Sequence, residues 1–364
     1  MQRCKLCLMP DSVPGSNFDS EGVCAWCREG YPPYTILGEQ ALRNKFKGLG
    51  SHQGKADCLV GLSGGKDSTY ALYRLVKHYH LKAEAFIYTH GGSRDYAIRN
   101  AEKTCARLGV KLHYTSLKEN AHSQAFLNYF KAWLAHPGAT AAGMTCVACK
   151  HLHILGSKLA TQRKIPYVVW SSTPLEYSPF LAIRHTGDAK HQFQREGLLQ
   201  SGVKMARAMV SSPKFAWGVL AQPRTSILGC LAVFPSSSFL RLSYPDVKPI
   251  MFYSFEKWNP DHILDTITSE LDWQIPAEIT EDWHTDCVFN VFKEYMFQKM
   301  FGVSYTDAHL SNQIRHGFIS REEGRIKLRE SKLYYAAAVA PALQQLGAQE
   351  LMSKIDLSCF DVEI

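Results

Sequence analysis

The segment Ser-Gly-Gly-Lys-Asp-Ser combines the residue types of an anion-binding loop. An apolar run over 57–62 precedes it, and a helical pattern over 67–80 follows it. The two glycines allow a tight turn, after which the amides at the start of the helix converge on one spot that suits a phosphate. The serines add hydroxyl donors, the lysine adds charge, and the aspartate is a candidate Mg²⁺ ligand. The candidate binding residues are Ser63, Gly64, Gly65, Lys66, Asp67 and Ser68, and the candidate catalytic residues are Lys66, Asp67 and Ser68.

The order of these residues differs from a Walker A loop, which needs four residues between its first Gly and its Gly-Lys pair. The segment resembles instead the PP-loop of ATP pyrophosphatases. That resemblance implies that ATP binds here and is cleaved between its α- and β-phosphates, so that AMP passes to a substrate and pyrophosphate leaves. A plain turn between a strand and a helix is the alternative interpretation.

Two Cys-x-x-Cys pairs lie near the N-terminus. Each pair can form a tight turn that presents two thiolates, and two such turns complete a tetrahedral shell for Zn²⁺. Because no coordination position stays open, we expect a structural zinc that contributes to the folding of this segment. Free thiols in a small cap are the alternative. The candidate ligands are Cys4, Cys7, Cys24 and Cys27.

A second set of cysteines consists of Cys146 and Cys149, which precede a predicted helix, and Cys287 far downstream. A pair and a distant third cysteine could hold a second metal, or an iron–sulfur cluster with one open site. Certain PP-loop enzymes that thiolate tRNA are similar in having three such cysteines around a [4Fe–4S] cluster. Zinc ligation shared with His151 or His153, and simple burial near the active site, are the alternatives.

Strands and helices alternate after the N-terminal segment. We expect strands at 57–62, 83–88, 110–114 and 167–170, and helices at 36–49, 67–80, 95–108, 119–135 and 148–162. This alternation predicts a parallel sheet with helices on both faces, whose ligands bind beyond the carboxyl ends of the strands. The glycine loop follows the first strand and therefore lies at that edge.

The second half of the chain gives a weaker pattern until about residue 250. The apolar run 215–234 is interrupted by proline, arginine and glycine, which predicts core or a lid and argues against a membrane span. Helices are expected at 260–272, 285–301, 305–316, 320–330 and 333–347. Asn259 and Ser320 suit N-caps, and Glu323 completes a capping box with Ser320.

The length of 364 residues suggests two or three domains, for which we expect the ranges 1–33, 34–250 and 251–364. With 46% hydrophobic and 20% charged residues the composition is that of a soluble globular chain, and the N-terminus lacks the apolar core of a signal peptide. We therefore expect a cytoplasmic protein. The net charge of +8 suits anionic ligands such as ATP but lacks the concentrated basic stripe of nucleic-acid binders.

Taken together, these motifs resemble the N-acetyl sugar amidotransferase family, which is related to proteins of lipopolysaccharide O-antigen biosynthesis. The similarity begins with residues 4–28, which we call the cysteine head, and with the PP-loop. It continues through Cys146-Val-Ala-Cys149, Leu175-Glu176-Tyr177 and His284-Thr-Asp286-Cys287 to Ile314-Arg315 and Arg321-Glu322-Glu323. It implies an α/β fold: a parallel-sheet PP-loop domain, like that of the adenine nucleotide alpha hydrolases, with an N-terminal zinc-ribbon-like segment and a helical C-terminal region. One departure is Trp170-Ser-Ser-Thr173, where the family tends to have Trp-Gly-Glu-Asn.

The resemblance implies an ATP-dependent amidotransferase that uses Mg²⁺ and Zn²⁺. Such an enzyme adenylates the N-acetyl carbonyl of a sugar and replaces its oxygen with ammonia-derived nitrogen. Residue 2 is Gln, and Cys230 does not match a nucleophile elbow, so we expect a separate glutaminase subunit or free ammonium as donor. A sulfurtransferase that uses the second cysteine set is the alternative. A zinc-ribbon nucleic-acid binder with an inactive loop is a third.

Several other residues have two interpretations each. His284 and Asp286 either order the active site or form a cap and a satisfied polar pair. Arg315 and Arg321 either approach an anionic substrate or are exposed helix charges. The aromatic residues Tyr96, Trp133 and Trp170 are expected in the core.

Overall fold

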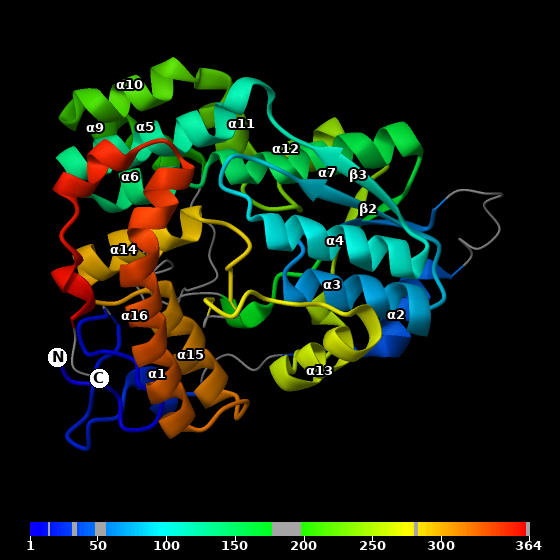
Figure 1. Ribbon diagram of the computed structural model, residues 1–364, viewed down its shortest axis with the longest axis horizontal. Helices are drawn as coiled ribbons and strands as arrows, with labels where there is room; N and C mark the ends of the chain where they lie inside the picture. The colour runs from blue at the N-terminus through cyan, green and yellow to red at the C-terminus, as the bar shows by residue number, and fades with distance from the viewer. Residues whose placement is uncertain (14, 31–34, 48–55, 177–197, 280–282, 362–364) are drawn as a thin grey trace.

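Five parallel strands form one sheet in the order β3-β2-β1-β4-β5 (Figure 1). The structure is a computed structural model that describes residues 1–13, 15–30, 35–47, 56–176, 198–279 and 283–361. The strands are β1 (Cys58–Gly61), β2 (Ala83–Tyr88), β3 (Lys111–Thr115), β4 (Tyr167–Trp170) and β5 (Lys248–Met251). The chain runs outward from β1 to β3 on one side and continues through β4 to β5 on the other, so the direction of winding changes between β1 and β4. Ligands of open parallel sheets bind at such a switch point.

Alternate residues of the central strand face opposite layers of helices. Val60 packs in the cluster beneath α3, α4 and α13, whereas Leu59 packs in the cluster beneath α7. Because both faces are apolar, the strand is a continuous apolar run in the sequence, which is the pattern that predicted it. The elements around the sheet are α2 (Glu39–Phe46), α3 (Lys66–Tyr73) with a π-helical turn at Arg74–His78, α4 (Asp95–Leu108), α7 (His151–Arg163), α12 (Ser238–Ser243) and α13 (Pro260–Leu271).

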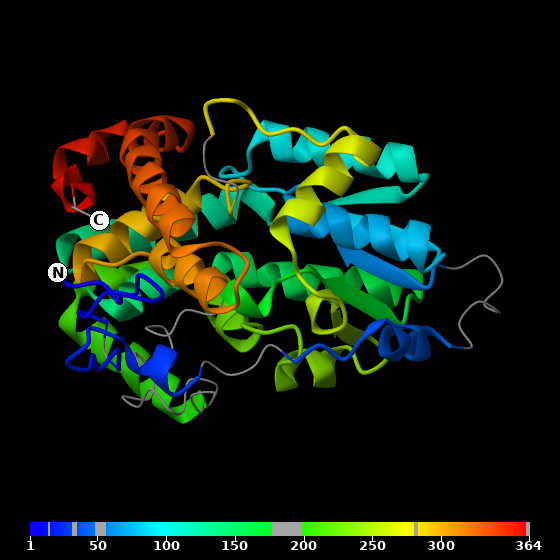
Figure 2. The same ribbon diagram turned by 90° about the horizontal axis from the view of Figure 1, so that it is seen from below.

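A helical part lies at the other end of the molecule from the sheet in both ribbon views (Figures 1 and 2). Its own hydrophobic cluster joins α5, α6, α14 and α16 to the N-terminal cysteine segment. The helices are α1 (Ala25–Arg28), α5 (Ala121–Ala135), α6 (Ala139–Met144), α9 (Leu198–Ser211), α10 (Pro213–Ala221), α11 (Pro223–Leu231), α14 (Phe289–Phe301), α15 (Tyr305–Arg315) and α16 (Arg321–Gln345). Short 3₁₀ turns lie at Lys118–Asn120, Ala148–Lys150, Pro174–Glu176, Phe252–Ser254, Gln349–Lys354 and Leu357–Phe360.

The predicted fold class is confirmed: a parallel sheet covered by helices, a four-cysteine group at the N-terminus and a helical C-terminal region. The division into domains stays a prediction. Residues 252–273 contribute Phe252, Trp258 and Trp273 to the cluster beneath the sheet. In the part of the chain that the structure describes, no helix is long and apolar enough to cross a membrane.

The structure has five helices that were not predicted from the sequence, α6 and α9 to α12, and the apolar run 215–234 lies mostly in α10 and α11. It also differs from the prediction at three further elements. Strand β5 was missed because Pro249 interrupts its pattern, and an edge strand tolerates proline since one side needs no ladder hydrogen bonds. The two helices predicted at 320–330 and 333–347 are one helix, α16. Ser331 and Lys332, which were expected to form a loop between them, are helical and buried. Helix α14 begins later than predicted, at Phe289, because the preceding residues pair with another loop.

The capping predictions are confirmed. His262 N donates to Asn259 Oδ1 at 3.2 Å, and Pro260 occupies the first turn of α13. At the start of α16, Glu323 N donates to Ser320 Oγ at 3.1 Å and Ser320 N donates to Glu323 Oε2 at 2.8 Å. These bonds satisfy amides that the helix itself leaves unpaired.

One carboxyl group is fully buried between α14, α15 and α16. Glu294 is 0% exposed, and its Oε2 accepts from Thr306 N at 3.3 Å. Its Oε1 has no hydrogen-bond partner among the described residues. Burial raises the pKa of Glu294 to about 7, because a carboxylate loses its hydration there.

This carboxyl should make stability depend on pH. A carboxyl whose pKa is higher in the folded than in the unfolded protein holds its proton more tightly in the folded state. The stability that this proton contributes is fully present below the pKa of the unfolded state and is lost as pH rises through about 7. Glu294→Gln, which stays uncharged, is therefore expected to stabilise the protein by up to about 3 kcal/mol near pH 8 and to have little effect near pH 5. Thermal unfolding at both pH values measures this, with Glu330→Gln on the exposed face of α16 as the control. Equal effects of Glu294→Gln at both pH values would contradict the prediction.

Candidate active site

The glycine loop lies between the carboxyl end of β1 and the start of α3. Gly64 has φ +83°, and a Cβ at this position would lie 1.8 Å from the carbonyl oxygen of Ala97 in α4. A side chain would thus be strained by the backbone and would also collide with a neighbouring helix. Only glycine fits, so the turn is built as tightly as the sequence predicts.

Two serines brace the loop from inside. Ser63 N donates to Ser68 Oγ at 3.1 Å, and Gly65 N donates to Ser63 Oγ at 3.2 Å. The Ser68 hydroxyl also lies 3.1 Å from the carbonyl oxygen of Gly65, to which it can donate. Gly65 is the N-cap of α3 and has no side chain to bond the first-turn amides. The helix therefore presents its positive end at the switch point of the sheet, where an anion would be stabilised.

The two charged residues of the loop are held by aromatic residues from beyond β5. Lys66 is 3% exposed, and its Nζ lies 3.8 Å from Asp67 Oδ2 and 5.9 Å from the ring centre of Trp258. Trp258 Nε1 donates to Asp67 Oδ1 at 2.7 Å, and the Tyr253 hydroxyl donates to the carbonyl oxygen of Asp67 at 3.1 Å. Trp273 Nε1 donates to the carbonyl oxygen of Gly64 at 2.9 Å. The turn is thus held by hydrogen bonds from its own serines and from these aromatic residues.

These contacts bear on the predicted Mg²⁺ ligand. One carboxylate oxygen of Asp67 accepts from an indole, and the other lies near the ammonium of Lys66. An oxygen ligand for Mg²⁺ is chemically present, with a cation beside it that also suits phosphate oxygens. The role of Asp67 as a metal ligand stays a prediction.

A segment from the second half of the chain reaches the glycine loop. Arg94 N donates to the carbonyl oxygen of Asp286 at 3.1 Å, and Ser93 and Cys287 form an antiparallel bridge. Asp286 Oδ2 lies 3.8 Å from where a Cβ of Gly65 would be. His284 Nε2 lies 3.7 Å from Glu176 Oε2. The motif around Asp286 therefore lies at the edge of the loop, which favours the site-ordering interpretation over a remote cap.

The same segment places Cys287 within electrostatic range of Cys146. A hydrogen bond with Cys149, aided by the positive charges of Lys293 and Lys150, lowers the pKa of Cys146 to about 5. Burial raises the pKa of Cys287 to about 12, and the negative charge of Cys146 acts in the same direction. The three sulfur atoms do not form a compact ligand group: among the described residues, only the N-terminal cysteines have at least three ligand atoms within 4.8 Å of one another. Whether the three hold a cluster or a metal stays a prediction.

Two histidines that the sequence did not single out join these cysteines. Cys149 Sγ lies 3.3 Å from His122 Nε2, and Cys287 Sγ lies 4.0 Å from His90 Nε2. Gly92 N donates to His90 Nδ1 at 3.1 Å, and burial lowers the pKa of His90 to about 4. A neutral ring that accepts at Nδ1 carries its proton at Nε2, the atom that faces the cysteine. The two rings lie 4.0 Å apart between centres.

The predicted alternative with His151 and His153 as zinc ligands is not supported by the contacts of these residues. His151 Nε2 lies 2.9 Å from the carbonyl oxygen of Thr225, and His153 Nδ1 lies 2.7 Å from that of Ala232. Both rings bind the backbone of α11 and the residue after it, which is a structural role. Zinc ligation that involves these histidines stays a prediction.

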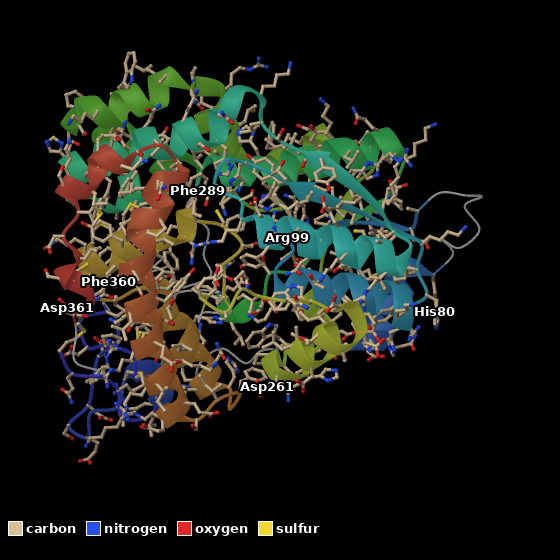
Figure 3. All side chains as sticks on the ribbon, viewed as in Figure 1. His80, Arg99, Asp261, Phe289, Phe360 and Asp361 are labelled. Atoms are coloured by element: carbon tan, nitrogen blue, oxygen red, sulfur yellow. The ribbon has the colours of Figure 1, made fainter. Side chains whose placement is uncertain are left out.

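An open cavity of about 390 Å³ lies at the carboxyl ends of β2 and β3. Its lining residues are Thr89, His90, Gly91, Ser116, Leu117, Asn120, His122 and Ser123. Burial lowers the pKa of both histidines, so that the lining carries no charge near neutral pH. Phe289, labelled in Figure 3, stacks on His90 with 5.1 Å between ring centres. Hydroxyl, amide and imidazole groups in an uncharged cavity suit a neutral ligand with many hydroxyl groups.

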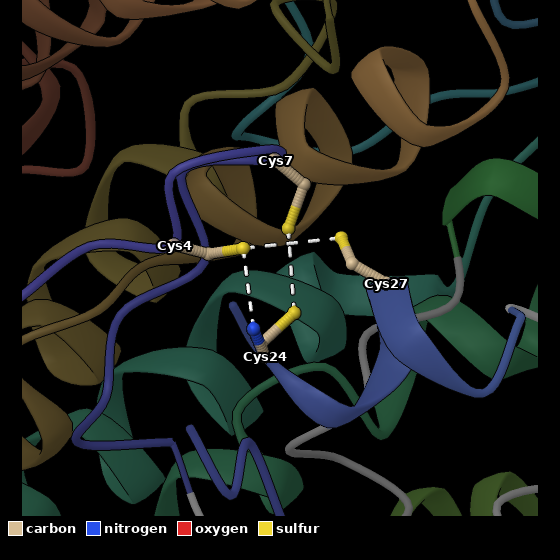
Figure 4. Close-up of side chains that lie close together, drawn as sticks. All are labelled: Cys4, Cys7, Cys24 and Cys27. Atoms are coloured by element: carbon tan, nitrogen blue, oxygen red, sulfur yellow. Dashed lines mark hydrogen bonds between the residues drawn. The ribbon is translucent and has the colours of Figure 1, made fainter. Parts of the chain in front are cut away.

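The four N-terminal cysteines converge on one point (Figure 4). The sulfur atoms of Cys4 and Cys27 lie 3.9 Å apart, and those of Cys7 and Cys24 lie 3.6 Å apart. These separations match the edge of about 3.8 Å expected for a tetrahedron of sulfurs around Zn²⁺. Cys24 N also donates to Cys4 Sγ at 3.3 Å, as suits a thiolate. The four residues therefore fit a structural zinc ion, whose presence stays a prediction.

Both arginines of the C-terminal motifs bind this cysteine head. Arg315 Nη1 donates to Cys7 Sγ at 2.9 Å, and the Arg321 guanidinium donates to the carbonyl oxygen of Cys4 at 3.5 Å. Hydrogen bonds from Cys24 and Cys27, together with the charge of Arg315, lower the pKa of Cys7 to about 7. The interpretation as exposed helix charges is wrong, because these bonds join the head to α15 and α16. An approach of either arginine to an anionic substrate stays a prediction.

The expected core aromatics are confirmed, since Tyr96, Trp133 and Trp170 are all buried. Trp170 limits the space beside the loop, because a Cβ on Gly61 would lie 3.0 Å from its ring. Part of the predicted Leu175-Glu176-Tyr177 motif, Tyr177, lies outside the described residues.

Comparison with known proteins gives remote similarities of structure. No family model matches the sequence, and no curated protein matches it. An NH₃-dependent NAD synthetase of Campylobacter jejuni is 16% identical over 40% of this chain and 58% of its own, less than two thirds of its length, with a TM-score of 0.29. The NMN synthetase of Francisella tularensis is 12% identical over 86% and 93%, with a TM-score of 0.37. The U34-tRNA thiolase of Methanococcus maripaludis, solved with its [4Fe–4S] cluster, is 16% identical over 100% and 94%, with a TM-score of 0.36. Similarities at this level identify no substrate or reaction for this chain.

Proposed function

We propose that the protein is an ATP-dependent amidotransferase that forms AMP and pyrophosphate. The observation that carries the proposal is the loop from Ser63 to Ser68 at the switch point of the sheet, with a turn that only glycine can make and a buried lysine at the start of α3. Nucleotidyl transfer needs positioning and charge neutralisation more than covalent chemistry. A helix N-terminus and Lys66 supply both to a leaving pyrophosphate.

The reaction proceeds in two steps. The carbonyl oxygen of an N-acetyl group attacks the α-phosphorus of ATP, the bond from that phosphorus to the bridging oxygen breaks, and pyrophosphate leaves with the electron pair. Ammonia then adds to the activated carbon, and AMP departs with the former carbonyl oxygen. Loss of protons from the added nitrogen gives the amidine. Mg²⁺, with Asp67 as its proposed ligand, supplies charge neutralisation of the phosphates when bound.

The uncharged cavity at the ends of β2 and β3 is the proposed acceptor site. It lies on the same edge of the sheet as the loop, and its hydroxyl and amide groups suit the hydroxyls of a sugar. Asn120 and Ser116 would bond the ring hydroxyls, and Leu117 gives one apolar wall. An acceptor whose reacting part is anionic would find no countercharge among these residues.

The cysteine nearest to a nucleophile-elbow pattern, Cys230, does not suit a glutaminase. Cys230 lies within α11, where its Sγ contacts Met144 Sδ at 3.8 Å and burial raises its pKa. A glutaminase nucleophile needs a lowered pKa and an exposed turn, and this residue has neither. We therefore propose that ammonium, free or from a glutaminase subunit, is the donor.

A second candidate function is sulfur transfer through the same adenylated intermediate. The observation that favours it is the position of Cys287, next to Asp286 at the loop and coupled by charge to Cys146. Cys146, with its lowered pKa, would be the thiolate that carries or accepts sulfur. A [4Fe–4S] cluster on the three cysteines, if bound, would supply an open site for sulfide.

One experiment separates these functions. The protein is incubated with ATP, Mg²⁺ and N-acetylated sugars, and either ammonium or sulfide is added. We expect AMP and pyrophosphate in equal amounts, and with ammonium a product whose mass differs by the exchange of O for NH. An exchange of O for S, lost in Cys287→Ala, would establish the second function instead. Formation of ADP would contradict both, because it requires cleavage at the γ-phosphate.

A further inference from the structure

The outer surface of α9, α10 and α11 exposes large apolar side chains. The exposed residues are Val203 (44%), Val210 (88%), Trp217 (67%), Leu220 (63%) and Ile227 (56%). We call this surface, together with the exposed cations Arg207, Lys214 and Arg224, the α9–α11 face. Helices α9 and α10 lie at the edge of the molecule in both ribbon views (Figures 1 and 2).

The orientation of the face is fixed by close packing on its inner side. Gly218 of α10 lies against Tyr129 of α5, with 3.3 Å from a hypothetical Cβ to the ring. The Tyr129 hydroxyl lies 2.6 Å from Ser226 Oγ in α11. A Cβ on Gly229 would lie 2.3 Å from the carbonyl oxygen of Val147. Small residues thus place α10 and α11 on α5 and its neighbours, and α9 packs on the same cluster through Met205, Ala208 and Met209. The large exposed apolar residues lie on the other sides of these helices.

The face is also basic throughout. The sequence over 198–231 contains Lys204, Arg207, Lys214 and Arg224 and neither Asp nor Glu. Arg207, Lys214 and Arg224 form no ion pair with any residue that the structure describes. A surface that combines exposed Trp and Leu with unpaired cations is complementary to a layer with negative headgroups above an apolar interior.

We propose that the α9–α11 face binds the surface of a membrane that contains anionic lipid. Trp217, Leu220 and Val210 enter the boundary between headgroups and acyl chains, and the three cations bind lipid phosphates. The protein then lies on the membrane, in keeping with the finding that no described helix can span one. The inference does not depend on the proposed function.

Two other occupants fit the face less well. A second copy related by a twofold axis would bring the same cations together, and like charges at an interface oppose association. A nucleic acid would satisfy the cations but would leave Val210, Leu220 and Ile227 beside a polar backbone. An anionic membrane is complementary both to the exposed apolar side chains and to the cations of the face.

Flotation of the full-length protein with lipid vesicles tests the proposal. Vesicles of phosphatidylcholine with phosphatidylglycerol should carry the protein upward, vesicles of phosphatidylcholine alone should not, and high salt should weaken the binding. Trp217→Ser/Leu220→Ser and Lys214→Glu/Arg224→Glu should each weaken binding by at least about 10-fold.

Controls separate loss of binding from loss of the fold. Leu333→Ser and Lys327→Glu change an exposed leucine and an exposed lysine on α16 and should leave flotation unchanged. Absence of flotation with anionic vesicles, or equal flotation of the double variants and the parent protein, overturns the proposal. So does sedimentation of the lipid-free protein as a dimer that Trp217→Ser/Leu220→Ser dissociates, because the occupant is then a second copy.

Discussion

Removing the charge of Lys66 is expected to lower the rate of pyrophosphate release by about 30- to 1,000-fold, which corresponds to about 2–4 kcal/mol of barrier. Pyrophosphate gains negative charge as it leaves, and Lys66 is the buried cation of the loop at the start of α3. An ammonium in a site with little water stabilises developing charge more strongly than one in solvent. Its loss should therefore reduce kcat more than it raises KM for ATP.

Two substitutions test this without relying on one variant alone. Lys66→Ala removes the charge and leaves a space beside Trp258, whereas Lys66→Met removes the charge and keeps most of the volume. Both variants should lose pyrophosphate release to a similar degree, and Lys66→Met should be closer to the parent protein in thermal stability. Lys77→Ala is the matched control, because Lys77 is exposed on the π-helical turn that continues α3. A Lys66→Met protein that releases pyrophosphate within about threefold of the parent rate would refute the role of this lysine.

The loop and its strand were predictable because they depend on neighbours in sequence. An apolar strand, two glycines and a helical pattern specify a turn whatever the rest of the chain does, and the structure has that turn between Gly61 and Lys66. The knuckles of the cysteine head are local in the same way, since each Cys-x-x-Cys pair closes within a few residues.

The groups that hold the loop were not predictable, because they come from far along the chain. Trp258 and Trp273 bond to residues 191 and 209 positions away, and nothing near either tryptophan indicates a phosphate site. His90 follows β2 without a motif, and only the fold brings it to Cys287. The contacts of Arg315 and Arg321 with the head were missed for the same reason, because their partners Cys7 and Cys4 lie at the other end of the sequence.

The head is joined to the helical part by ionic contacts, which gives the second large prediction. Arg3 donates to Asp307 Oδ1 at 2.7 Å, where both side chains are buried, and Arg315 donates to Cys7. The head is too short to bury a core of its own, so a bound metal should supply much of its folding free energy. Loss of one ligand from a closed four-cysteine site would release the metal and expose the surfaces of α15 and α16 that the head covers.

Cys24→Ser is accordingly expected to lower the zinc content from about one ion per chain to none and to destabilise the protein by at least about 4 kcal/mol. Elemental analysis and thermal unfolding measure the two effects, and a chelator should reproduce the second in the parent protein. Cys105→Ala removes a buried thiol from α4, away from the head, and should cost only about 1 kcal/mol with the metal retained. If Cys24→Ser unfolds at the parent temperature, the head is held by its arginine contacts and apolar packing rather than by a metal. If Cys24→Ser unfolds at a lower temperature but the parent protein contains no zinc, the thiols themselves stabilise the head. Removal of a sulfur atom, and not of a metal ion, then explains the loss of stability.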